Sequence, residues 1–492
     1  MKKYVPYLLL ALPFFLLKIT NIGIWLSDTN IYFYTGYQLL QGEVLYKDIF
    51  FTNFPLIPYI SALYFLVTGG NIPLFFFTTT IEVIAAGFLI YLIVRRENSQ
   101  NMALLTAAIY LYSFIILATS DHQTGVFLGS VFSLLSYYFL IIKQKPFLSG
   151  TFIALALLTK AYFLPIFISF LIFLFFERRS PKARSSNNET MEQLYHDNQS
   201  SRFSAMRSPN GWRITRTILL FLSGFTAATI IVLLPSLLTA PTDLLRDVFL
   251  YSLTRSQGID KARIAYFFLT HEALFALLLF WNILMIYKRL LFGLISISSL
   301  LFFLLYQDIY YLYLNFCIPF LALSFPTLQS AIRQIFSLQK MLIPTILLGI
   351  IFLNLYLYIS SQRTKQKIEN ITAITTVIIN EKPQTLYGIN SLTPALAYLT
   401  KTPLLDGIID TNENIFRKGF LNKKSLTARA IEQNALLISN AAIYPNLGIT
   451  YPLLGGIFDE QAVYKSCRLI GTFPVQPEGI ENAINVFRCR NK

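Results

Sequence analysis

The sequence predicts an α-helical polytopic membrane protein with a small α/β domain at its carboxyl end. Of its 492 residues, 55% are hydrophobic and only 13% are charged, whereas a soluble domain carries roughly 25% charged residues. Apolar runs of the length that crosses a bilayer recur along residues 1–359. From residue 360 onward the composition becomes that of an ordinary soluble domain. These three observations define a transmembrane domain, 1–359, and a second domain, 360–492.

The formal net charge of +15 would suggest a nucleic-acid partner in a soluble protein. Here the basic residues cluster in short loops between apolar runs, as the cytoplasmic loops of membrane proteins do. We therefore expect no nucleic-acid partner. The "MKK" start leads into an apolar run too long for the core of a signal peptide, so it predicts a first span with a cytoplasmic amino terminus.

The placement of basic residues predicts about eleven membrane crossings. Arg95 and Arg96 end the second span on the inside, so residues 27–70 form a first external loop. The apolar stretch in that loop, "FPLIPYISALYFLV", is short for a span and predicts an interfacial or re-entrant helix. Lys18, near the outer end of the first span, is expected to snorkel to the headgroups. The predicted spans are 4–26, 71–94, 102–119, 124–142, 215–239, 264–287, one ending at Tyr306, one beginning at Ile309, and 341–359, with a hairpin over 147–176.

The hairpin is inferred from the charges on both sides of an almost wholly apolar stretch, 147–176. Lysines precede it and arginines follow it, so both ends lie inside and the chain must enter and return. Each leg has about 13–15 residues, or roughly 20–23 Å of helix, against about 30 Å of hydrocarbon. Lys160 is therefore predicted at a turn in the outer half of the membrane.

Residues 177–213 are polar and rich in Ser, Asn and Arg, which predicts a cytoplasmic loop with little order. The loop after the next span is external and contains Arg255, Lys261 and Arg263. Because each crossing changes the side of the membrane, the same count of crossings places residues 360–492 outside. Their helix-like run precedes the strand-like runs "TLYGI", "ALLIS", "CRLIGTF" and "AINVFRC", which predicts a small α/β domain.

Several polar residues of the first external loop are candidates for a site, and each also has a structural explanation. Asp28 directly follows the first span, but Ser27 or Asp28 also looks like the N-cap of a helix that ends before Gly42. Asp48 could simply pair with Lys47. Asn53 stands where an N-cap would precede the next helix.

Asp121 and His122 lie in the short external loop between two spans, where solvation alone could explain them. All these groups nevertheless share the external face, where an active site for a lipid-borne substrate could form. The three histidines are not spaced for zinc. The sequence also lacks a P-loop and a GxGxxG turn, which argues against an ATP-driven pump and a cytoplasmic nucleotide-sugar enzyme.

Ionisable residues at membrane depth form a second class of candidates. Lys160 is treated as functional by default, with snorkelling as the alternative. Glu82 lies in the middle of its span and is expected to pair with another span. His271 and Glu272 are expected to face a polar cavity.

The order of these motifs resembles the GT-C glycosyltransferases, in particular the branch with protein O-mannosyltransferases, aminoarabinose transferases and lipopolysaccharide-sugar transferases. Their first external loop reads Asp, an aromatic-rich helix, Gly, Pro-Tyr, Arg-Asp and an aromatic-Pro-Pro turn. Leu45 replaces the usual Pro, and Tyr310, in "YQDIYYLYLNFCIPFLAL", stands where the family has His. "SDHQTGVF" resembles the family's fourth-span Asp segment, and "GTFIALALLTKAYFLP" its fifth-span Lys segment. The matching residues are Asp28, Gly42, Tyr46, Lys47, Asp48, Pro55, Asp121 and Lys160.

The resemblance implies a GT-C-like transmembrane domain in the plasma membrane, surrounded by membrane lipids. It further implies a polyprenyl-phosphate sugar as donor, inversion at the anomeric carbon, and one carboxylate as general base. Such chemistry needs a positioned carboxylate for the acceptor proton and cations for the departing lipid phosphate. Asp28 is predicted as the base, Asp121 as a second rim carboxylate that positions the acceptor or a metal, and Lys160 as a ligand of the phosphate. The remaining predicted substrate contacts are Lys47, Asp48, Asn53, His122, Arg255, Lys261, Arg263 and Tyr310.

The acceptor is a glycan, a lipid or a protein, and the sequence does not choose among them. No cofactor is certain, and a divalent metal is possible. One alternative function is a transporter or flippase for a lipid-linked or small solute, which would need Glu82 and His271 at depth. Another is an anchor for the carboxyl-terminal domain, for which some eleven spans are excessive.

A disulfide is predicted between Cys467 and Cys489, because an external domain can keep one. The runs "CRLIGTF" and "AINVFRC" read as an antiparallel hairpin. A single register that pairs Ile470 with Val486 and Thr472 with Ile484 also sets Cys467 opposite Cys489. The alternative is two unrelated buried cysteines.

Overall fold

The computed structural model describes the chain in nine stretches, and all structural statements concern these residues. They are residues 2–176, 211–251, 258–307, 309–335, 342–362, 371–444, 449–454, 456–475 and 483–489. The predicted cytoplasmic loop, 177–213, lies almost entirely outside them.

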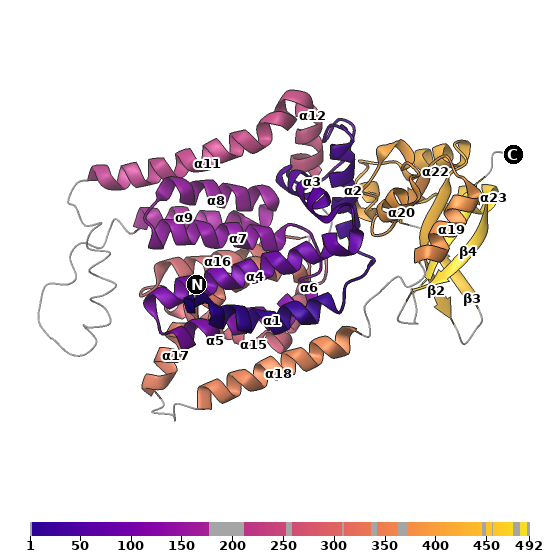
Figure 1. Cartoon of the computed structure of the whole chain (residues 1–492). Coiled ribbons are helices and arrows are strands. Elements are labelled where there is room, and N and C mark those ends of the chain that lie inside the picture. Colours follow the sequence, from indigo (N-terminus) through magenta and orange to yellow (C-terminus); the bar gives the residue numbers. More distant parts are fainter. Residues whose placement is uncertain are drawn as a thin grey trace, which may run out of the picture.

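The described residues up to 362 are mainly helical, and their long helices run side by side (Figure 1). Within the described stretches, two helices are long and apolar enough to cross a membrane, Ile72–Glu97 and Thr215–Thr239, and a bent pair would make a third. The count of eleven crossings therefore stays a prediction. The helices are α1 (Val5–Ile19), α2 (Thr29–Leu40), α3 (Leu56–Thr68), α4 (Ile72–Glu97), α5 (Gln100–Leu111), α6 (Phe114–Thr119), α7 (Val126–Tyr137), α8 (Pro146–Thr159), α9 (Leu164–Phe176), α11 (Gly211–Thr239), α12 (Pro241–Leu244), α14 (Lys261–His271), α15 (Ala273–Leu284), α16 (Leu290–Leu305), α17 (Ile318–Ile335) and α18 (Leu342–Gln362).

Large apolar side chains are exposed along the outer helices of this bundle. Ile231 of α11 is 71% exposed, Phe352 of α18 is 68% exposed, and Leu9 of α1 is 64% exposed. Contiguous apolar surface of this kind marks a face that meets lipid or a partner. In a helical bundle with this apolar sequence, we expect these exposed side chains to face the bilayer.

Two predicted spans end or bend earlier than expected. The first helix stops at Ile19 because the side chains of Thr20 and Asn21 both donate hydrogen bonds to the Leu17 carbonyl, which the next turn would otherwise use. The predicted span 264–287 is not one straight helix. It is two helices, α14 and α15, bent by 102° at Glu272, which together form a broken span or a re-entrant loop.

The predicted hairpin has the expected legs, α8 with 14 residues and α9 with 13. They are separated at Lys160, which has an extended backbone (φ −153°, ψ 132°), and by one 3₁₀ turn, Ala161–Phe163. The short helix expected in the first external loop is α3. It packs closely on α2 at Gly36, where a Cβ atom would approach the Ser61 carbonyl to 2.6 Å.

The carboxyl-terminal domain is built on one five-stranded sheet. Its strand order is β1-β2-β5-β4, with β3 pairing with β2, and only the β1–β2 pair is parallel. Each of the four strand-like runs seen in the sequence forms a strand. The elements are α19 (Ile371–Glu381), β1 (Leu386–Gly388), α20 (Thr393–Thr400), α21 (Glu413–Arg417), α22 (Lys423–Glu432), β2 (Leu436–Tyr444), β3 (Ile449–Leu453), α23 (Glu460–Ser466), β4 (Cys467–Pro474) and β5 (Ala483–Cys489).

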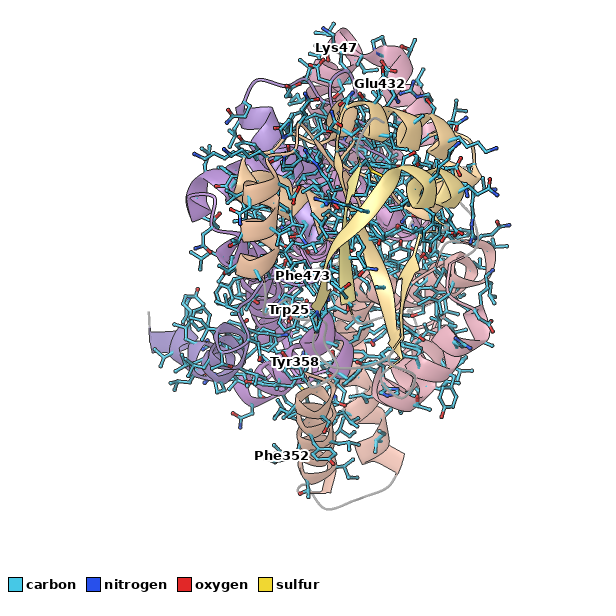
Figure 2. The ribbon with its side chains drawn as sticks, turned by 90° about the vertical axis from the view of Figure 1, so that its right-hand side faces the viewer. Trp25, Lys47, Phe352, Tyr358, Glu432 and Phe473 are labelled. Atoms are coloured by element: carbon cyan, nitrogen blue, oxygen red, sulfur yellow. A yellow bond between two sulfur atoms is a disulfide. The ribbon has the colours of Figure 1, made fainter. Side chains whose placement is uncertain are left out.

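The two faces of this sheet belong to different cores. Leu436 and Ile438 of β2 join a cluster that also contains residues of the first external loop, whereas Leu437 joins a cluster confined to the carboxyl-terminal domain. The domain is therefore docked on the loop end of the helical bundle, with α20 beside α2 (Figure 1). Viewed from that end, Phe473 lies near Trp25, and both belong to the shared cluster (Figure 2).

Cys467 and Cys489 form a disulfide, with Cα atoms 4.0 Å apart and directly paired in the ladder between β4 and β5. The predicted register holds as far as Leu469, which pairs with Phe487, and is wrong beyond it. A bulge at Ile470 shifts the ladder by one residue, so Val486 pairs with Gly471 and Ile484 pairs with Phe473. A bulge adds one residue to one strand, so beyond it every residue pairs one position away from where a regular ladder would place it.

Candidate functional site

Lys160 is the central cation of the candidate site. Its side chain is 7% exposed, and its amine donates hydrogen bonds to the Tyr32 hydroxyl (2.7 Å) and to Asn53 Oδ1 (2.8 Å). The amine also lies 5.2 Å from the centre of the Tyr32 ring. The break between α8 and α9 thus directs the amine at the first external loop, since both partners belong to that loop.

Asn53 is held by this contact and not by a helix cap. The N-cap position of α3 is taken by Pro55, so the expected capping role of Asn53 is wrong. Its carbonyl accepts a hydrogen bond from the Tyr46 hydroxyl at 2.6 Å. Tyr46 has a left-handed backbone (φ 69°), a conformation that non-glycine residues rarely adopt. Its ring is buried, and this burial raises the pKa of its phenol.

Asp28 is exposed at the start of α2. It occupies the N-cap position, but the capping hydrogen bond comes from Ser27, whose Oγ accepts from the Thr29 N–H at 3.2 Å. Tyr32 follows Asp28 by four residues and therefore lies one helical turn further along the same face. The exposed carboxylate and the buried amine of Lys160 are thus linked through a single turn of α2.

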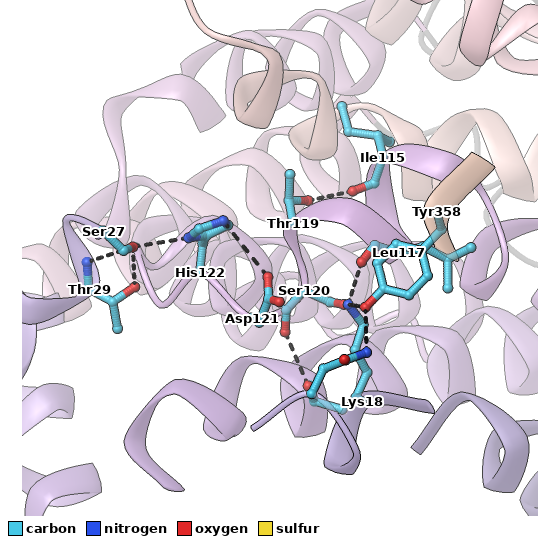
Figure 3. A network of polar contacts seen from close by, with 12 residues as sticks. Lys18, Ser27, Thr29, Ile115, Leu117, Thr119, Ser120, Asp121, His122 and Tyr358 are labelled. Carbon is cyan, nitrogen blue, oxygen red and sulfur yellow. Dashed lines mark hydrogen bonds and ion pairs between the residues drawn. The ribbon is translucent and has the colours of Figure 1, made fainter. Parts of the chain in front are cut away.

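Asp121 and His122 follow α6 and meet the residue before Asp28. His122 Nδ1 lies 3.0 Å from Ser27 Oγ, and His122 Nε2 lies 3.8 Å from Asp121 Oδ1 (Figure 3). Asp121 is 9% exposed, and His122 is half-buried. The predicted loop between two spans therefore reaches the start of α2.

The snorkelling predicted for Lys18 is wrong. Its side chain is only 3% exposed. Its amine donates hydrogen bonds to the carbonyl of Leu117, in α6, and to the hydroxyl of Tyr358, in α18, at 3.1 Å for the latter (Figure 3). Lys18 of α1 therefore joins α6 and α18 through its hydrogen bonds, close to the loop that contains Asp121.

Glu82 has two partners that the sequence did not identify. Its Oε1 accepts hydrogen bonds from the Tyr64 hydroxyl and from Gln123 Nε2, both at 2.8 Å. Gln123 Oε1 in turn accepts from the Gly125 N–H at 3.2 Å. Glu82, 5% exposed in α4, therefore braces α3 and the chain that follows His122.

Glu272 lies at the bend between α14 and α15 and is 3% exposed. Its Oε1 accepts a hydrogen bond from the Ile115 N–H (2.5 Å), in the first turn of α6. His271 and Glu272 both line a hollow, as expected, and Ser113, Thr270 and Asn354 line it too. Most of its other lining side chains are apolar and come from α15 and α18, so the cavity is less polar than predicted.

The other predicted substrate contacts divide by position. Lys47 and Asp48 are exposed beyond the far end of α2, and Lys47 lies well away from Trp25 (Figure 2). The Asp48 carboxylate accepts from the Val44 N–H at 2.9 Å within its own turn. These two residues are thus not brought to the Lys160 contact.

Lys261 donates a hydrogen bond to the Leu304 carbonyl at the end of α16, and Arg263 is exposed in α14. Tyr310 packs on Tyr313, with ring centres 5.6 Å apart, and Tyr313 packs on Tyr162, two residues after Lys160. Arg255 lies outside the described residues. Tyr310, which stands where the resemblance places His, is thus linked to the turn after Lys160 through two ring contacts.

Asp247 is a buried carboxylate close to the same loop. It is 0% exposed, and its Oδ1 accepts from Arg246 Nε at 2.6 Å. Burial raises the pKa of Asp247, although Arg246 acts in the opposite direction. Phe249, two residues on, packs on Phe54. Within the described part of the chain, no group of three or more His, Cys, Asp or Glu side chains gathers where a metal ion could be held.

Comparison with known proteins supports the resemblance seen in the sequence. Residues 53–187, less than half of the chain, match the sequence model of the family described as dolichyl-phosphate-mannose-protein mannosyltransferase. A search of curated proteins gave no significant match.

Among solved structures, the chain is similar to ArnT from Cupriavidus metallidurans bound to undecaprenyl phosphate, with a TM-score of 0.59, 10% identity, and coverage of 98% of this chain and 97% of ArnT. The apo state of that protein matches equally. The Archaeoglobus fulgidus oligosaccharyltransferase, in complex with Zn and sulfate, matches with a TM-score of 0.51 and 12% identity, covering 88% of this chain and 68% of that protein. The fold is therefore that of the GT-C glycosyltransferases, a membrane-protein fold.

Sequence reasoning missed several residues of the site. Tyr32 could have been found, because a hydroxyl one helical turn after Asp28 shares its face. No sequence pattern pointed to Ser391 and Asp410 of the carboxyl-terminal domain as residues near the site. They reach the first external loop only through the tertiary fold, across more than 350 residues of sequence.

Proposed function

We propose that this chain is an integral-membrane inverting glycosyltransferase that moves a sugar from a polyprenyl-phosphate carrier to an acceptor on the extracytoplasmic face. The observation that carries the proposal is the Lys160 amine, which donates to Tyr32 and Asn53, with Tyr32 one helical turn after the exposed Asp28 in α2. A cation that contacts α2 and a carboxylate at the start of the same helix suit a reaction that releases a phosphate and removes a proton.

In this reaction the acceptor hydroxyl attacks the anomeric carbon from the side opposite the phosphate. The bond between that carbon and the phosphate oxygen breaks, so the configuration inverts. Asp28 takes the acceptor proton, and Lys160 stabilises the charge of the lipid phosphate that leaves. The contact between His122 and Ser27 brings Asp121 near the start of α2. We assign Asp121 the role of positioning the acceptor.

The similarity to ArnT, whose solved structure holds undecaprenyl phosphate, supports a polyprenyl-phosphate donor. The transporter alternative is less favoured, because Glu82 and Glu272 are occupied by fixed donors of neighbouring helices. Carboxylates that brace helices are poorly suited to carry an ion through alternating states.

The test is an assay of the purified protein in lipid with a panel of polyprenyl-phosphate sugars. Mass spectrometry follows release of the lipid phosphate and transfer to added glycan, lipid and peptide acceptors. We expect one donor to turn over in wild type and not in Asp28→Asn. Release that continues undiminished in Asp28→Asn, or the absence of release with every donor, contradicts the proposal.

A further inference from the structure

The carboxyl-terminal domain touches the first external loop beside two of the proposed site residues. The Ser391 carbonyl accepts hydrogen bonds from the Ser27 N–H (3.1 Å) and from Asn30 Nδ2 (2.5 Å), on either side of Asp28 in the sequence. Asp410 Oδ2 accepts from the Thr52 hydroxyl at 3.2 Å, directly before Asn53. Each contact is thus one or two residues from a group of the site.

Asp410 is built into the domain as a fixed acceptor. It is 7% exposed, and its Oδ1 accepts from Asn390 Nδ2 at 3.2 Å and from the Asn412 N–H at 3.1 Å. A buried carboxylate needs such donors, because its charge has left water. With Oδ1 held by donors of its own domain, Oδ2 is turned toward the first external loop, where it accepts from Thr52.

The segment that receives this contact has no regular structure of its own. Residues 51–54 lie between an isolated bridge and α3, outside any helix or ladder. Thr52 is 2% exposed. The direction of the Asn53 side chain therefore depends on side-chain contacts, namely Thr52 with Asp410 before it and Tyr46 on its own carbonyl.

We propose that Asp410 is a positioning residue: through Thr52 it fixes Asn53, and through Asn53 it fixes the amine of Lys160. The carboxyl-terminal domain is then part of the donor side of the site and not only a neighbour of it. The consequence for donor binding rests on the proposed function, whereas the positioning of Lys160 does not.

The positioning is tested by the chemical reactivity of Lys160 in the full-length protein in lipid nanodiscs. Acetylation of Lys160 and of Lys18 is followed by mass spectrometry in wild type, Asp410→Ala, Thr52→Val and the double variant. Lys18 is the internal reference because it is equally buried but has partners elsewhere. Glu413→Gln, an exposed carboxylate of the same domain, is the matched control.

We expect each single variant to raise the acetylation rate of Lys160 by roughly fivefold, the size of one lost buried hydrogen bond, with Lys18 and the Glu413→Gln control unchanged. Because both substitutions break the same hydrogen bond between Thr52 and Asp410, the double variant should add nothing to the effect of Asp410→Ala. An unchanged Lys160 rate overturns the inference, and so does a double variant in which the single effects multiply. Thr52→Val keeps the side-chain shape, so the test holds even if Asp410→Ala does not fold.

Binding of undecaprenyl phosphate by the same proteins separates this inference from the proposed function. Weaker binding in Asp410→Ala and Thr52→Val, alongside faster Lys160 acetylation, supports both. Faster acetylation with undecaprenyl phosphate binding equal to wild type supports the positioning and contradicts the phosphate role of Lys160. Unchanged acetylation overturns the positioning whatever the binding result.

Discussion

Two regions at the loop end of the helical bundle each bury a lysine, and they use it differently. Lys160, at the break between α8 and α9, is 7% exposed, and Lys18, at the end of α1, is 3% exposed. The partners of Lys160 are side chains of an external loop, Tyr32 and Asn53. The partners of Lys18 belong to two packed helices, α6 and α18.

The difference teaches that burial alone does not mark a functional cation. A lysine among packed helices has partners that cannot leave without disturbing the core, so its charge serves the fold. Lys160 instead contacts the Tyr32 hydroxyl of α2 and the Asn53 amide of an irregular segment, two acceptors that a phosphate oxygen can replace. Tyr32 follows Asp28 by one helical turn, which gives that exchange a chemical purpose. The following predictions test whether the two regions separate in this way.

The largest effect is expected at Asp28, beside the Lys160 region. Asp28→Asn removes the base while keeping the shape of the side chain, so turnover should fall by about 10²–10⁴-fold. The measurement is the initial rate of lipid-phosphate release. The control is Glu43→Gln, which changes an exposed carboxylate beyond the other end of α2 and should keep the wild-type rate. Near-normal turnover of Asp28→Asn would rule the assignment out.

The second effect should appear in stability and belongs to the Lys18 region. Lys18→Met removes the amine that donates to the Leu117 carbonyl and to the Tyr358 hydroxyl, which costs about 2 kcal/mol. Thermal unfolding in detergent should therefore begin at a lower temperature than in wild type. Affinity of the folded protein for undecaprenyl phosphate should stay close to wild type. A variant with normal stability and poor lipid-phosphate binding would reverse the roles given to the two lysines.

Glu82 is a third case for the comparison. It holds the chain next to Asp121 through Gln123, and the hydrogen bonds that its carboxylate accepts come from Tyr64 and Gln123. Glu82→Gln keeps an oxygen that can accept from Tyr64 and Gln123, so most of the transfer rate should remain. Glu82→Ala removes it and should lower kcat by roughly tenfold, the effect of a small misplacement of site groups. A transporter that uses Glu82 as an ion carrier would instead lose its function in the Gln variant as well.

The smallest effect concerns pH and Asp247, outside the predicted spans. Burial raises the pKa of Asp247 in the folded state, so its contribution to stability is present below about pH 3.9, the ordinary Asp pKa, and is lost as pH rises through the raised value. Asp247→Asn should remove this loss. The melting temperature should then fall less with rising pH in Asp247→Asn than in wild type. Parallel melting curves across that range would exclude a titrating Asp247.

The sequence predicted the parts of the site that depend on residue patterns within one segment and on the side of the membrane where the basic residues lie. Basic residues on both sides of 147–176 located the turn at Lys160, and strand alternation located the pair Cys467 and Cys489. The bulge at Ile470 escaped prediction, because one extra residue in a ladder leaves no mark in the alternation.

Tertiary contacts account for the other errors. Lys18 looked like a snorkelling residue because the sequence does not show that α18 covers it with Tyr358. The bend between α14 and α15 lies at Glu272, whose carboxylate accepts a hydrogen bond from Ile115, more than 150 residues away. Asp410 and Thr52 meet only once the carboxyl-terminal domain has docked. Such contacts are set by the fold, so a pattern within one segment cannot reveal them.

The central claim is that Lys160 holds the phosphate of the donor, and the most direct test is affinity for undecaprenyl phosphate. Wild type, Lys160→Arg and Lys160→Met are compared in nanodiscs, with Lys18→Met as the buried-lysine control. A hydrogen bond to a charged group contributes about 1.5–3 kcal/mol, so Lys160→Met should weaken binding by roughly tenfold or more. Lys160→Arg, which keeps the charge, should lose less. Equal affinity of wild type and both Lys160 variants would contradict the account.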